Sequence, residues 1–492
     1  MKILLIVFVL MLTSVESKSQ GYLNFPLDTI VSDEFYNYRN MAKFDANGKI
    51  HMVNTRQFHT NSATREIFYR NNVSGSFVTT RLTHNNTDDN YASFGFDSQG
   101  FVHIGWEQRD AGNLFQLIYK NNRGGTFGDS VWITSGGVNK ATPFMAVGKD
   151  SLVHFVYYTY STGNNNAYYR NYNFITNQLG PEVFLSAAMT GSENDIEVAV
   201  DNNNKIHIIY CTNVNINGGA LRYWTNESGT LTEIPTGISA NGEYPDITID
   251  NGNEIHIVYR LATDKRIYVL RRLSGGNFQT PLAISPSSIG NPSYWRSIDT
   301  DDKGTLFVTY QNSTNPAPRG FFLIHVIGNN VSQPILVFED STASYIGRGS
   351  SSVAARKEGE LAVTFDPTAS RNGNVASDIF LKKGTLIVTD IKNPSIPIPK
   401  GYVLNQNYPN PFNPSTKISF EIPEASIIEL KIFSSIGNEV MSVINNEKKQ
   451  KGFYEYNINF SDLTTGIYFY RLTAISDNNI KTEITKKLIF MK

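Results

Sequence analysis

Short runs of β-branched and aromatic residues recur along most of the chain, each preceded by a turn rich in Asp, Asn and Gly. Residues 101–106 form one such run after Asp97, and close relatives follow Asp45, Asp201 and Asp250. The position held by His51 in the first copy is held in the later copies by His103, His154, His207, His256, Phe307 and Ala362. The copies are 49 to 55 residues apart and number seven. A fixed period of this length indicates a repeat architecture.

Each copy predicts four short antiparallel strands. Two strands flank the Asp-containing turn, a third follows at positions such as 67–70 and 117–120, and a fourth comes after a Gly-containing turn, as at 130–134. Four strands in a repeat of about 51 residues are typical of a β-propeller blade. The sequence therefore predicts an all-β fold, with a seven-bladed β-propeller over residues 21–390.

The start of the predicted propeller resembles the last strand of a blade. Phe25 precedes Asp45 by 20 residues, the same separation as between Phe77 and Asp97. We therefore expect residues 25–31 to pair with the blade that contains residues 361–365. Such pairing closes the ring and removes an exposed sheet edge.

A change of composition separates the repeats from a second domain. Residues 391–401 are rich in Pro, as expected of an extended linker. Beyond them Ile418, Phe420 and Ile422 alternate with polar residues, a pattern of half-buried strands. We expect a small Ig-like β-sandwich over residues 402–492.

This second domain carries specific motifs. A phrase with repeated Asn-Pro pairs runs from Tyr402 to Thr416, and the chain ends with Lys486-Lys-Leu-Ile489. Together the motifs resemble the type A C-terminal sorting domain of type IX secretion cargo. The resemblance rests on Asn407, Pro409, Asn410, Pro411, Gly466, Tyr468, Lys487 and Leu488. It implies recognition by the type IX machinery and export through the periplasm to the cell surface or the medium. An Ig-like carbohydrate-binding module is the alternative.

The N-terminus has the pattern of an export signal. Lys2 is followed by an apolar run over residues 3–12 and by small residues near position 17, so residues 1–19 are expected to be a signal peptide. The run is shorter than the roughly 20 residues of a membrane-spanning helix, and no later segment of the sequence is long and apolar enough. We therefore expect no transmembrane segment.

The charge balance and the cysteine content argue against a nucleic-acid binder and against a fold held by internal disulfides. The chain has 43 Lys and Arg against 44 Asp and Glu, a balance that argues against an electrostatic nucleic-acid binder. Cys211 is the sole cysteine, so no internal disulfide can form.

The recurring histidines invite a metal or catalytic interpretation, but a residue repeated in every blade is spread round a ring. We expect His51 and its successors to form hydrogen bonds inside the blades. The turn from Asp299 to Gly304 approaches a calcium loop, yet Lys303 occupies the place of an oxygen ligand. We expect no metal and no cofactor.

Residues just before the first strand and just after the second strand of each blade should share one face near the central channel. Unlike the histidines, they differ from blade to blade, as a pocket requires. Aromatic rings offer stacking surfaces, Arg can hold a carboxylate, and Glu or Asp can act as acid or base. The predicted ligand-binding residues are Arg39, Arg56, Trp106, Glu107, Arg260, Trp295, Arg296, Arg348 and Asp366. Tyr91, Arg109, Tyr158, Asp195 and Tyr244 occupy the same two positions.

The repeats loosely resemble the propellers of bacterial sialidases and polysaccharide lyases, but the Ser-x-Asp-x-Gly-x-Thr-Trp box of sialidases is missing. No catalytic residue can therefore be assigned from the resemblance. We expect a secreted or surface module that binds polysaccharide or protein. A glycan-active hydrolase or lyase and a structural adhesion protein are the alternatives.

Overall fold

A computed structural model divides the chain into two compact units, Met1–Val388 and Thr389–Lys492. The structure describes residues 23, 25–31, 35–58, 64–161, 164–189, 196–212, 219–286, 297–312, 320–339, 350–371, 374–386, 402–404, 406–407, 410–449, 452–476 and 481–491. The predicted signal peptide (1–19) and linker (391–401) lie outside these residues. Within them no helix combines the length and hydrophobicity needed to cross a membrane.

The described part of the first unit forms seven sheets, antiparallel except for one parallel pairing, and each is named by the strand given first below. The β2 sheet contains β2 (Tyr36–Phe44), β3 (Ile50–Gln57), β4 (Arg65–Asn71) and β5 (Val78–Arg81). The β6 sheet contains β6 (Asp89–Phe96), β7 (Val102–Arg109), β8 (Phe115–Asn121) and β9 (Val131–Trp132). The β10 sheet contains β10 (Asn139–Val147), β11 (Leu152–Ser161), β12 (Asn164–Asn173), β13 (Gln178–Leu179) and β14 (Val183–Met189). The β15 sheet contains β15 (Ile196–Val200), β16 (Ile206–Thr212), β17 (Ala220–Thr225) and β18 (Thr232–Pro235).

The remaining sheets complete the unit. The β19 sheet contains β19 (Gly242–Ile249), β20 (Glu254–Leu261), β21 (Ile267–Leu273) and β22 (Leu282–Ala283). The β23 sheet contains β23 (Ser297–Thr300), β24 (Leu306–Asn312), β25 (Gly320–Ile327), β26 (Asn330–Val331) and β27 (Ile335–Glu339). The β28 sheet contains β28 (Ser351–Ala355), β29 (Glu360–Phe365), β32 (Ile379–Thr385) and β1 (Leu27–Val31). A short 3-10 turn, η1 (Lys357–Gly359), connects β28 to β29.

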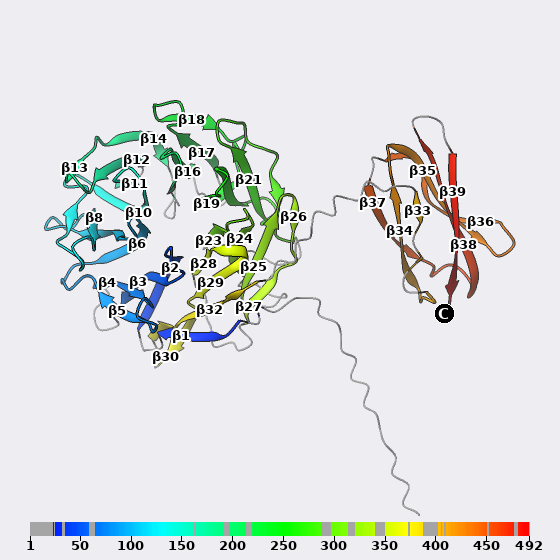
Figure 1. Ribbon diagram of the computed structural model, residues 1–492, viewed down its shortest axis with the longest axis horizontal. Helices are drawn as coiled ribbons and strands as arrows, with labels where there is room; N and C mark the ends of the chain where they lie inside the picture. The colour runs from blue at the N-terminus through cyan, green and yellow to red at the C-terminus, as the bar shows by residue number, and fades with distance from the viewer. Residues whose placement is uncertain are drawn as a thin grey trace, which may run out of the picture. The chain divides into compact units, whose positions relative to one another are not determined.

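The hydrophobic core of this unit lies between neighbouring sheets, which Figure 1 shows arranged in a ring. Val53 of the β2 sheet packs in one cluster with Trp106 of the β6 sheet. The series continues around the ring to a cluster that joins Ala362 of the β28 sheet to Ala42 of the β2 sheet. Every sheet therefore buries both of its faces, and the predicted all-β propeller architecture is confirmed.

Two pairings join the ends of the ring. Strand β1 pairs with β32, with Leu27 opposite Lys382 and Thr29 opposite Phe380. This confirms the expected closing strand (Figure 1). A hairpin of β30 (Thr368–Arg371) and β31 (Asn374–Ser377) makes a second join, because Ser377 pairs in parallel with Tyr36 of β2. The sequence did not predict this second join.

The turn between the first two strands of a sheet explains the repeated Asp. In the β6 sheet Asp97 Oδ1 accepts hydrogen bonds from the backbone N–H groups of Gln99 and Phe101, at 2.9 and 3.0 Å. Gly100 supplies the left-handed backbone that the turn requires, with φ of 85°. The Asp-x-x-Gly pattern is therefore a turn signal, as predicted.

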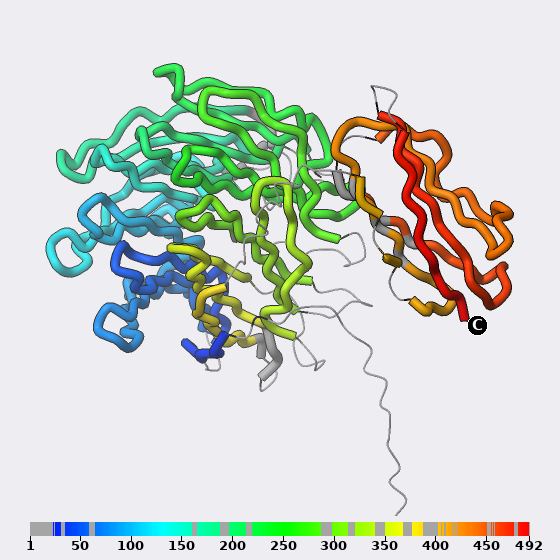
Figure 2. The backbone as a smooth tube through the Cα atoms, turned by 45° about the vertical axis from the view of Figure 1, so that its right-hand side comes forward, coloured from blue at the N-terminus to red at the C-terminus, as the bar shows by residue number. Residues whose placement is uncertain are grey.

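The second unit contains two sheets, whose strands run lengthwise beside one another in orange and red in Figure 2. One sheet contains β33 (Val403–Leu404), β34 (Ser415–Ile422) and β37 (Gly452–Asn459). The other contains β35 (Ser426–Ser434), β36 (Glu439–Lys449), β38 (Gly466–Ser476) and β39 (Lys481–Phe490). Phe420 and Ile422 of the first sheet share a buried cluster with Leu430 and Tyr470 of the second. Apolar side chains from the two sheets thus form one core, as the alternation at Ile418 to Ile422 predicts.

Candidate functional site

The first strands of all seven sheets converge on one cavity of about 460 Å³. Its lining is mixed, with apolar residues such as Met145 and Val198 beside charged ones. The charged residues that line it are Arg39, Lys43, Glu197, Asp246 and Asp299. A cavity with apolar walls and a few polar groups is the usual form of a ligand site.

Several of these first strands contain a β-bulge near one end. The pairing register shifts after Tyr38 in β2, after Asn90 in β6, after Ala141 in β10 and after Glu243 in β19. Inside each bulge lies a residue other than glycine with left-handed backbone: Arg39 (φ 56°), Tyr91 (φ 55°), Thr142 (φ 49°) and Tyr244 (φ 50°). A bulky residue in this region costs on the order of 1–3 kcal/mol. The surrounding structure must therefore hold each bulge in place.

Buried carboxylates of neighbouring sheets hold two of the bulges. Glu107 Oε2, in β7, accepts a hydrogen bond of 2.8 Å from the backbone N–H of Thr142 in the next sheet. Asp366 follows β29 and accepts a hydrogen bond of 2.7 Å from the Asn40 amide, as well as bonds from the backbone N–H and hydroxyl of Ser350. Burial raises the pKa of Glu107 to about 7 and that of Asp366 to about 7.

The neighbouring bulges of β2 and β6 meet at the cavity. The guanidinium carbon of Arg39 lies 3.3 Å from the centroid of the Tyr91 ring. Both residues line the cavity together with Thr142. A stacked guanidinium keeps its fork of donors in a defined plane, which suits carboxylate or sulfate groups.

Asp299 is a carboxyl group of the cavity wall whose pKa is raised. Its Oδ2 accepts a hydrogen bond of 2.8 Å from the backbone N–H of Ala355, and its Oδ1 accepts one of 2.9 Å from Thr300. Burial raises the pKa of Asp299 to about 6, and the charge of Lys43 opposes that rise. The sequence pointed to Asp299 only as part of a calcium-like turn, and it did not point to Lys43 or Thr142. Their position in the first strand, relative to the repeated Asp of the turn, was the available signal.

The other predicted binding residues occupy different surroundings. Trp106 is fully buried and donates a hydrogen bond of 2.7 Å to Asp89. Arg260 is 6% exposed, and its Nε donates to Glu243 at 2.6 Å. The guanidinium of Arg56 lies 4.4 Å from the Phe35 ring centroid.

Burial thus gives Trp106, Glu107, Arg260 and Asp366 partners inside the protein, in contrast to the expected position at an open face. Glu107 and Asp366 are buried because they accept hydrogen bonds from Thr142 and Asn40 of the adjacent sheet. Four further predicted residues lie outside the described part of the chain: Asp195, Trp295, Arg296 and Arg348. The structure therefore brings Arg39 and Tyr91 together at the cavity and turns the four buried residues inward.

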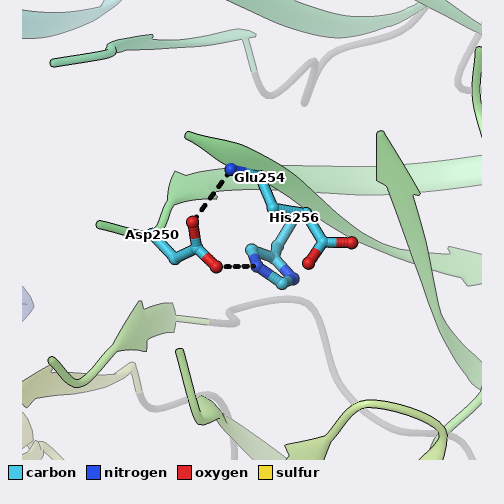
Figure 3. A group of neighbouring side chains, drawn as sticks. All are labelled: Asp250, Glu254 and His256. Carbon is cyan, nitrogen blue, oxygen red and sulfur yellow. Dashed lines mark hydrogen bonds and ion pairs between the residues drawn. The ribbon is translucent and has the colours of Figure 1, made fainter. Parts of the chain in front are cut away.

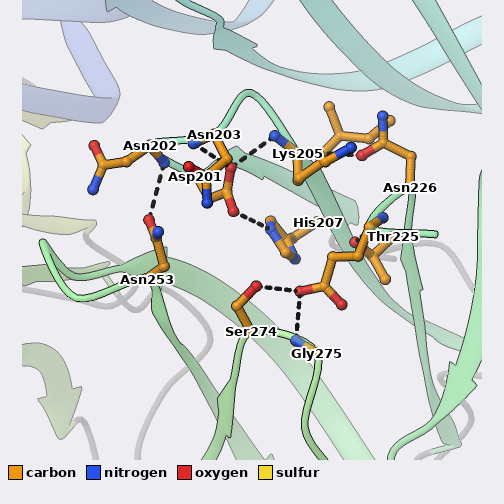
Figure 4. Close-up of polar contacts among 12 residues, drawn as sticks. Asp201, Asn202, Asn203, Lys205, His207, Thr225, Asn226, Asn253, Ser274 and Gly275 are labelled. Atoms are coloured by element: carbon orange, nitrogen blue, oxygen red, sulfur yellow. Dashed lines mark hydrogen bonds and ion pairs between the residues drawn. The ribbon is translucent and has the colours of Figure 1, made fainter. Parts of the chain in front are cut away.

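The recurring histidines lie inside their sheets, as predicted. The Nδ1 atom of His207 lies 2.5 Å from the Tyr223 hydroxyl, and its Nε2 lies 3.7 Å from Asp201 Oδ2. Asp201 Oδ1 in turn accepts from the backbone N–H groups of Asn203 and Lys205 (Figure 4). The same contact between Nδ1 and a Tyr hydroxyl occurs at His51, His103 and His154.

Burial lowers the pKa of His207 to about 4, so the imidazole is neutral at physiological pH. The interpretation as internal hydrogen-bonding residues is confirmed for His51, His103, His154 and His207. The turn at Asp301 also follows the common pattern, since its Oδ1 accepts from Lys303 and Thr305.

In the second unit the sorting motif brings together segments far apart in sequence. Asn410 Oδ1 accepts a hydrogen bond of 2.8 Å from the Ile489 backbone N–H. The backbone N–H of Asn407 donates to the Tyr470 hydroxyl at 2.9 Å. Tyr468 and Leu488 are buried in the shared core, whereas Pro411 and Lys487 are exposed. Gly466 begins β38, and Pro409 lies outside the described residues.

Comparison with known families agrees with the sorting-domain prediction for this second unit. Residues 406–491 match the family described as "Secretion system C-terminal sorting domain". The second unit is therefore a sorting domain, which directs its protein to the cell surface or the extracellular medium. No curated protein matches the chain.

Several solved structures are similar to the chain at low identity. An ulvan lyase of polysaccharide lyase family PL25 is 10% identical, with a TM-score of 0.46, over 73% of this chain and 97% of the other. The polysaccharide lyase Uly1 is 10% identical, with a TM-score of 0.45, over 76% and 94%. A Hadza microbial sialidase is 10% identical, with a TM-score of 0.40, over 66% and 74%.

Proposed function

We propose that this exported chain uses its propeller to bind an acidic polysaccharide at the cavity where the first strands converge. The observation that carries the proposal is the group of left-handed bulge residues, Arg39, Tyr91 and Thr142, that line one cavity. Strained backbone of this kind is concentrated at ligand clamps and active sites. Arg39 would hold a carboxylate or sulfate, and Tyr91 would offer a ring edge to the sugar.

The buried residues predicted from the sequence would act as positioning residues. Glu107 holds the backbone of Thr142, and Asp366 holds Asn40 next to Arg39. Arg260 holds Glu243 beside the Tyr244 bulge. In this proposal they fix the shape of the cavity wall without touching the ligand.

A glycan-active enzyme is the second candidate, and Asp299 is the observation that favours it. A cavity carboxyl group with a pKa of about 6 can exchange a proton near neutral pH. Replacement of Asp299 by Asn would abolish turnover if it were the acid or base. Saturable binding with no release of reducing or unsaturated ends would instead favour the binding module.

The test is binding of the full exported chain to alginate, carrageenan and dextran, which carry carboxylate, sulfate and no charge respectively. We expect saturable binding to one or both acidic polymers and none to dextran. Equal binding to all three would contradict the role of Arg39. Absence of saturable binding to any of them would favour a structural adhesion protein or a protein ligand.

A further inference from the structure

The β19 sheet departs from the histidine arrangement that other sheets share. In the β15 sheet the residue opposite His207 is Thr225. The hydroxyl of Tyr223, two residues before Thr225, contacts the Nδ1 atom of His207. In the β19 sheet the residue opposite His256 is Arg271, so the equivalent of the tyrosine is Val269. Val269 has no hydroxyl to offer.

His256 is a buried side chain whose Nδ1 lacks the tyrosine partner of the other sheets and whose Nε2 makes only a long contact with Asp250. It is 4% exposed, and among the described residues neither ring nitrogen has a hydrogen-bond partner. An unsatisfied buried polar group costs about 1–3 kcal/mol. Its Nδ1 atom therefore differs from that of His51, His154 and His207 in having no hydrogen-bond partner among the described residues.

A second departure places a carboxylate beside this imidazole. Glu254 occupies the turn position that Lys49 and Lys205 hold in two other sheets. Asp250 Oδ1 accepts from the backbone N–H groups of Gly252 and Glu254, both at 2.8 Å, so the turn itself is retained. The β19 turn therefore has a negative side chain where those two turns have a positive one, and the hydrogen bonds of its backbone are the same.

Figure 3 shows the three side chains beside one another, with the carboxylates of Asp250 and Glu254 on either side of the His256 ring. One ligand atom from each of Asp250, Glu254 and His256 lies within 4.8 Å of the other two. The distance from His256 Nε2 to Asp250 Oδ2 is 3.5 Å, long for a hydrogen bond. Two ligands about 2.1 Å from a tetrahedral ion are roughly 3.4 Å apart, so the spacing suits a shared metal.

We propose that Asp250, Glu254 and His256 bind a divalent transition-metal ion of the zinc class. One neutral imidazole and two carboxylates compensate the charge of such an ion and leave a coordination position for water. Calcium fits less well, because it takes six to eight oxygen ligands. The site lies in the turn from β19 to β20, at the opposite end of β19 from its bulge, so the ion would stabilise the turn independently of any glycan.

The β15 sheet provides the comparison within the same molecule. Asp201 and His207 repeat the geometry, with 3.7 Å between Oδ2 and Nε2 (Figure 4). In this sheet, however, the Tyr223 hydroxyl contacts Nδ1, and Lys205 has the turn position that Glu254 has in the β19 sheet. This turn has one carboxylate fewer and one positive charge more. Of the β15 and β19 turns, we therefore assign metal binding only to the β19 turn.

The experiment titrates Zn²⁺ into the untagged, metal-free full chain by calorimetry and Co²⁺ by visible absorption. We expect about one tight Zn²⁺ site per chain. The affinity should be at least tenfold weaker in Glu254→Lys, which introduces the residue type that Lys205 provides in the β15 turn. Glu233→Lys makes the same charge change at a partly exposed carboxylate and should keep the site. The thermal midpoint should rise with Zn²⁺ in the wild type and in Glu233→Lys only.

His256→Phe is a second variant, since Phe307 fills the equivalent position in the β23 sheet and shows that the niche accepts an aromatic ring. It should also lose the tight site while remaining folded. Zn²⁺ affinity in the wild type no greater than in Glu254→Lys, or full retention of the site in His256→Phe, would overturn the proposal.

Discussion

The most consequential residues are those in the bulges and the buried acids that hold them. Thr142 adopts left-handed backbone although it is β-branched, and the carboxylate of Glu107 accepts its N–H group. The sequence indicated Glu107 as a position that varies between repeats, but it did not point to Thr142. It could not reveal their orientation, because that depends on a bulge and on a contact with the next sheet.

The first prediction concerns the pH dependence of stability at Glu107. Burial raises its pKa from 4.5 to about 7, so the folded state binds more protons than the unfolded state between these values. Stability from this group is present below pH 4.5 and is lost as pH rises through about 7. Relative to Glu107→Gln, the wild type should therefore lose on the order of 2 kcal/mol of unfolding free energy across this window.

Denaturant unfolding at a series of pH values from 4.5 to 8 measures this difference. Glu233→Gln, at a partly exposed carboxylate, is the control and should run parallel to the wild type. A wild type that gains stability over Glu107→Gln as pH rises would show that the acid is held in its charged form.

At the scale of elements, the repeats predicted the strands well. The Asp turn marks the first two strands of each sheet, and the third strands fall where residues 67–70 and 117–120 predicted them, in β4 and β8. The histidines could be assigned an internal role because they repeat. The hairpin β30–β31 could not be foreseen, since the described residues of the other copies show no counterpart to it. The cluster of Asp250, Glu254 and His256 was not predicted either, because its spacing is not that of a calcium loop.

The second prediction tests the closing pair of strands. Leu27 and Lys382 are opposite one another in β1 and β32, so cysteines at both positions should form a disulfide. The link would close a loop of most of the propeller and stabilise it by up to about 4 kcal/mol. Non-reducing electrophoresis and thermal unfolding measure these effects.

The control pairs the cysteine at position 27 with Lys383→Cys, whose side chain points to the opposite face of the strand. It should remain unlinked. The native Cys211 is buried and should not interfere. Equal crosslinking of both pairs would mean that β1 does not keep this register.

At the scale of the whole molecule, the chain combines a propeller with a sorting domain that directs its export. The sorting domain could be identified from sequence because its motifs are specific. The structure adds that its first and last segments bind one another, with Asn410 on the Ile489 backbone. The ligand could not be identified in the same way, because the residues round the cavity vary between repeats and form no shared motif.

The third prediction concerns export. Deletion of residues 402–492 should leave the protein in the periplasm, because the machinery would find no sorting domain. Cell fractionation with an antibody against the propeller measures the location. Normal surface display or release of the truncated chain would show that another signal suffices.

Affinity for acidic polysaccharide in Arg39→Gln tests the central claim most directly. Arg222→Gln is the control, since Arg222 pairs with Glu233 and does not line the cavity. By calorimetry with alginate or carrageenan, whichever binds the wild type, we expect Arg39→Gln to bind at least tenfold more weakly, a loss of about 1.4 kcal/mol. Arg222→Gln should bind as the wild type does, and all three proteins should unfold at similar temperatures. Unchanged affinity in Arg39→Gln, or an equal loss in both variants, would contradict a ligand site at the cavity.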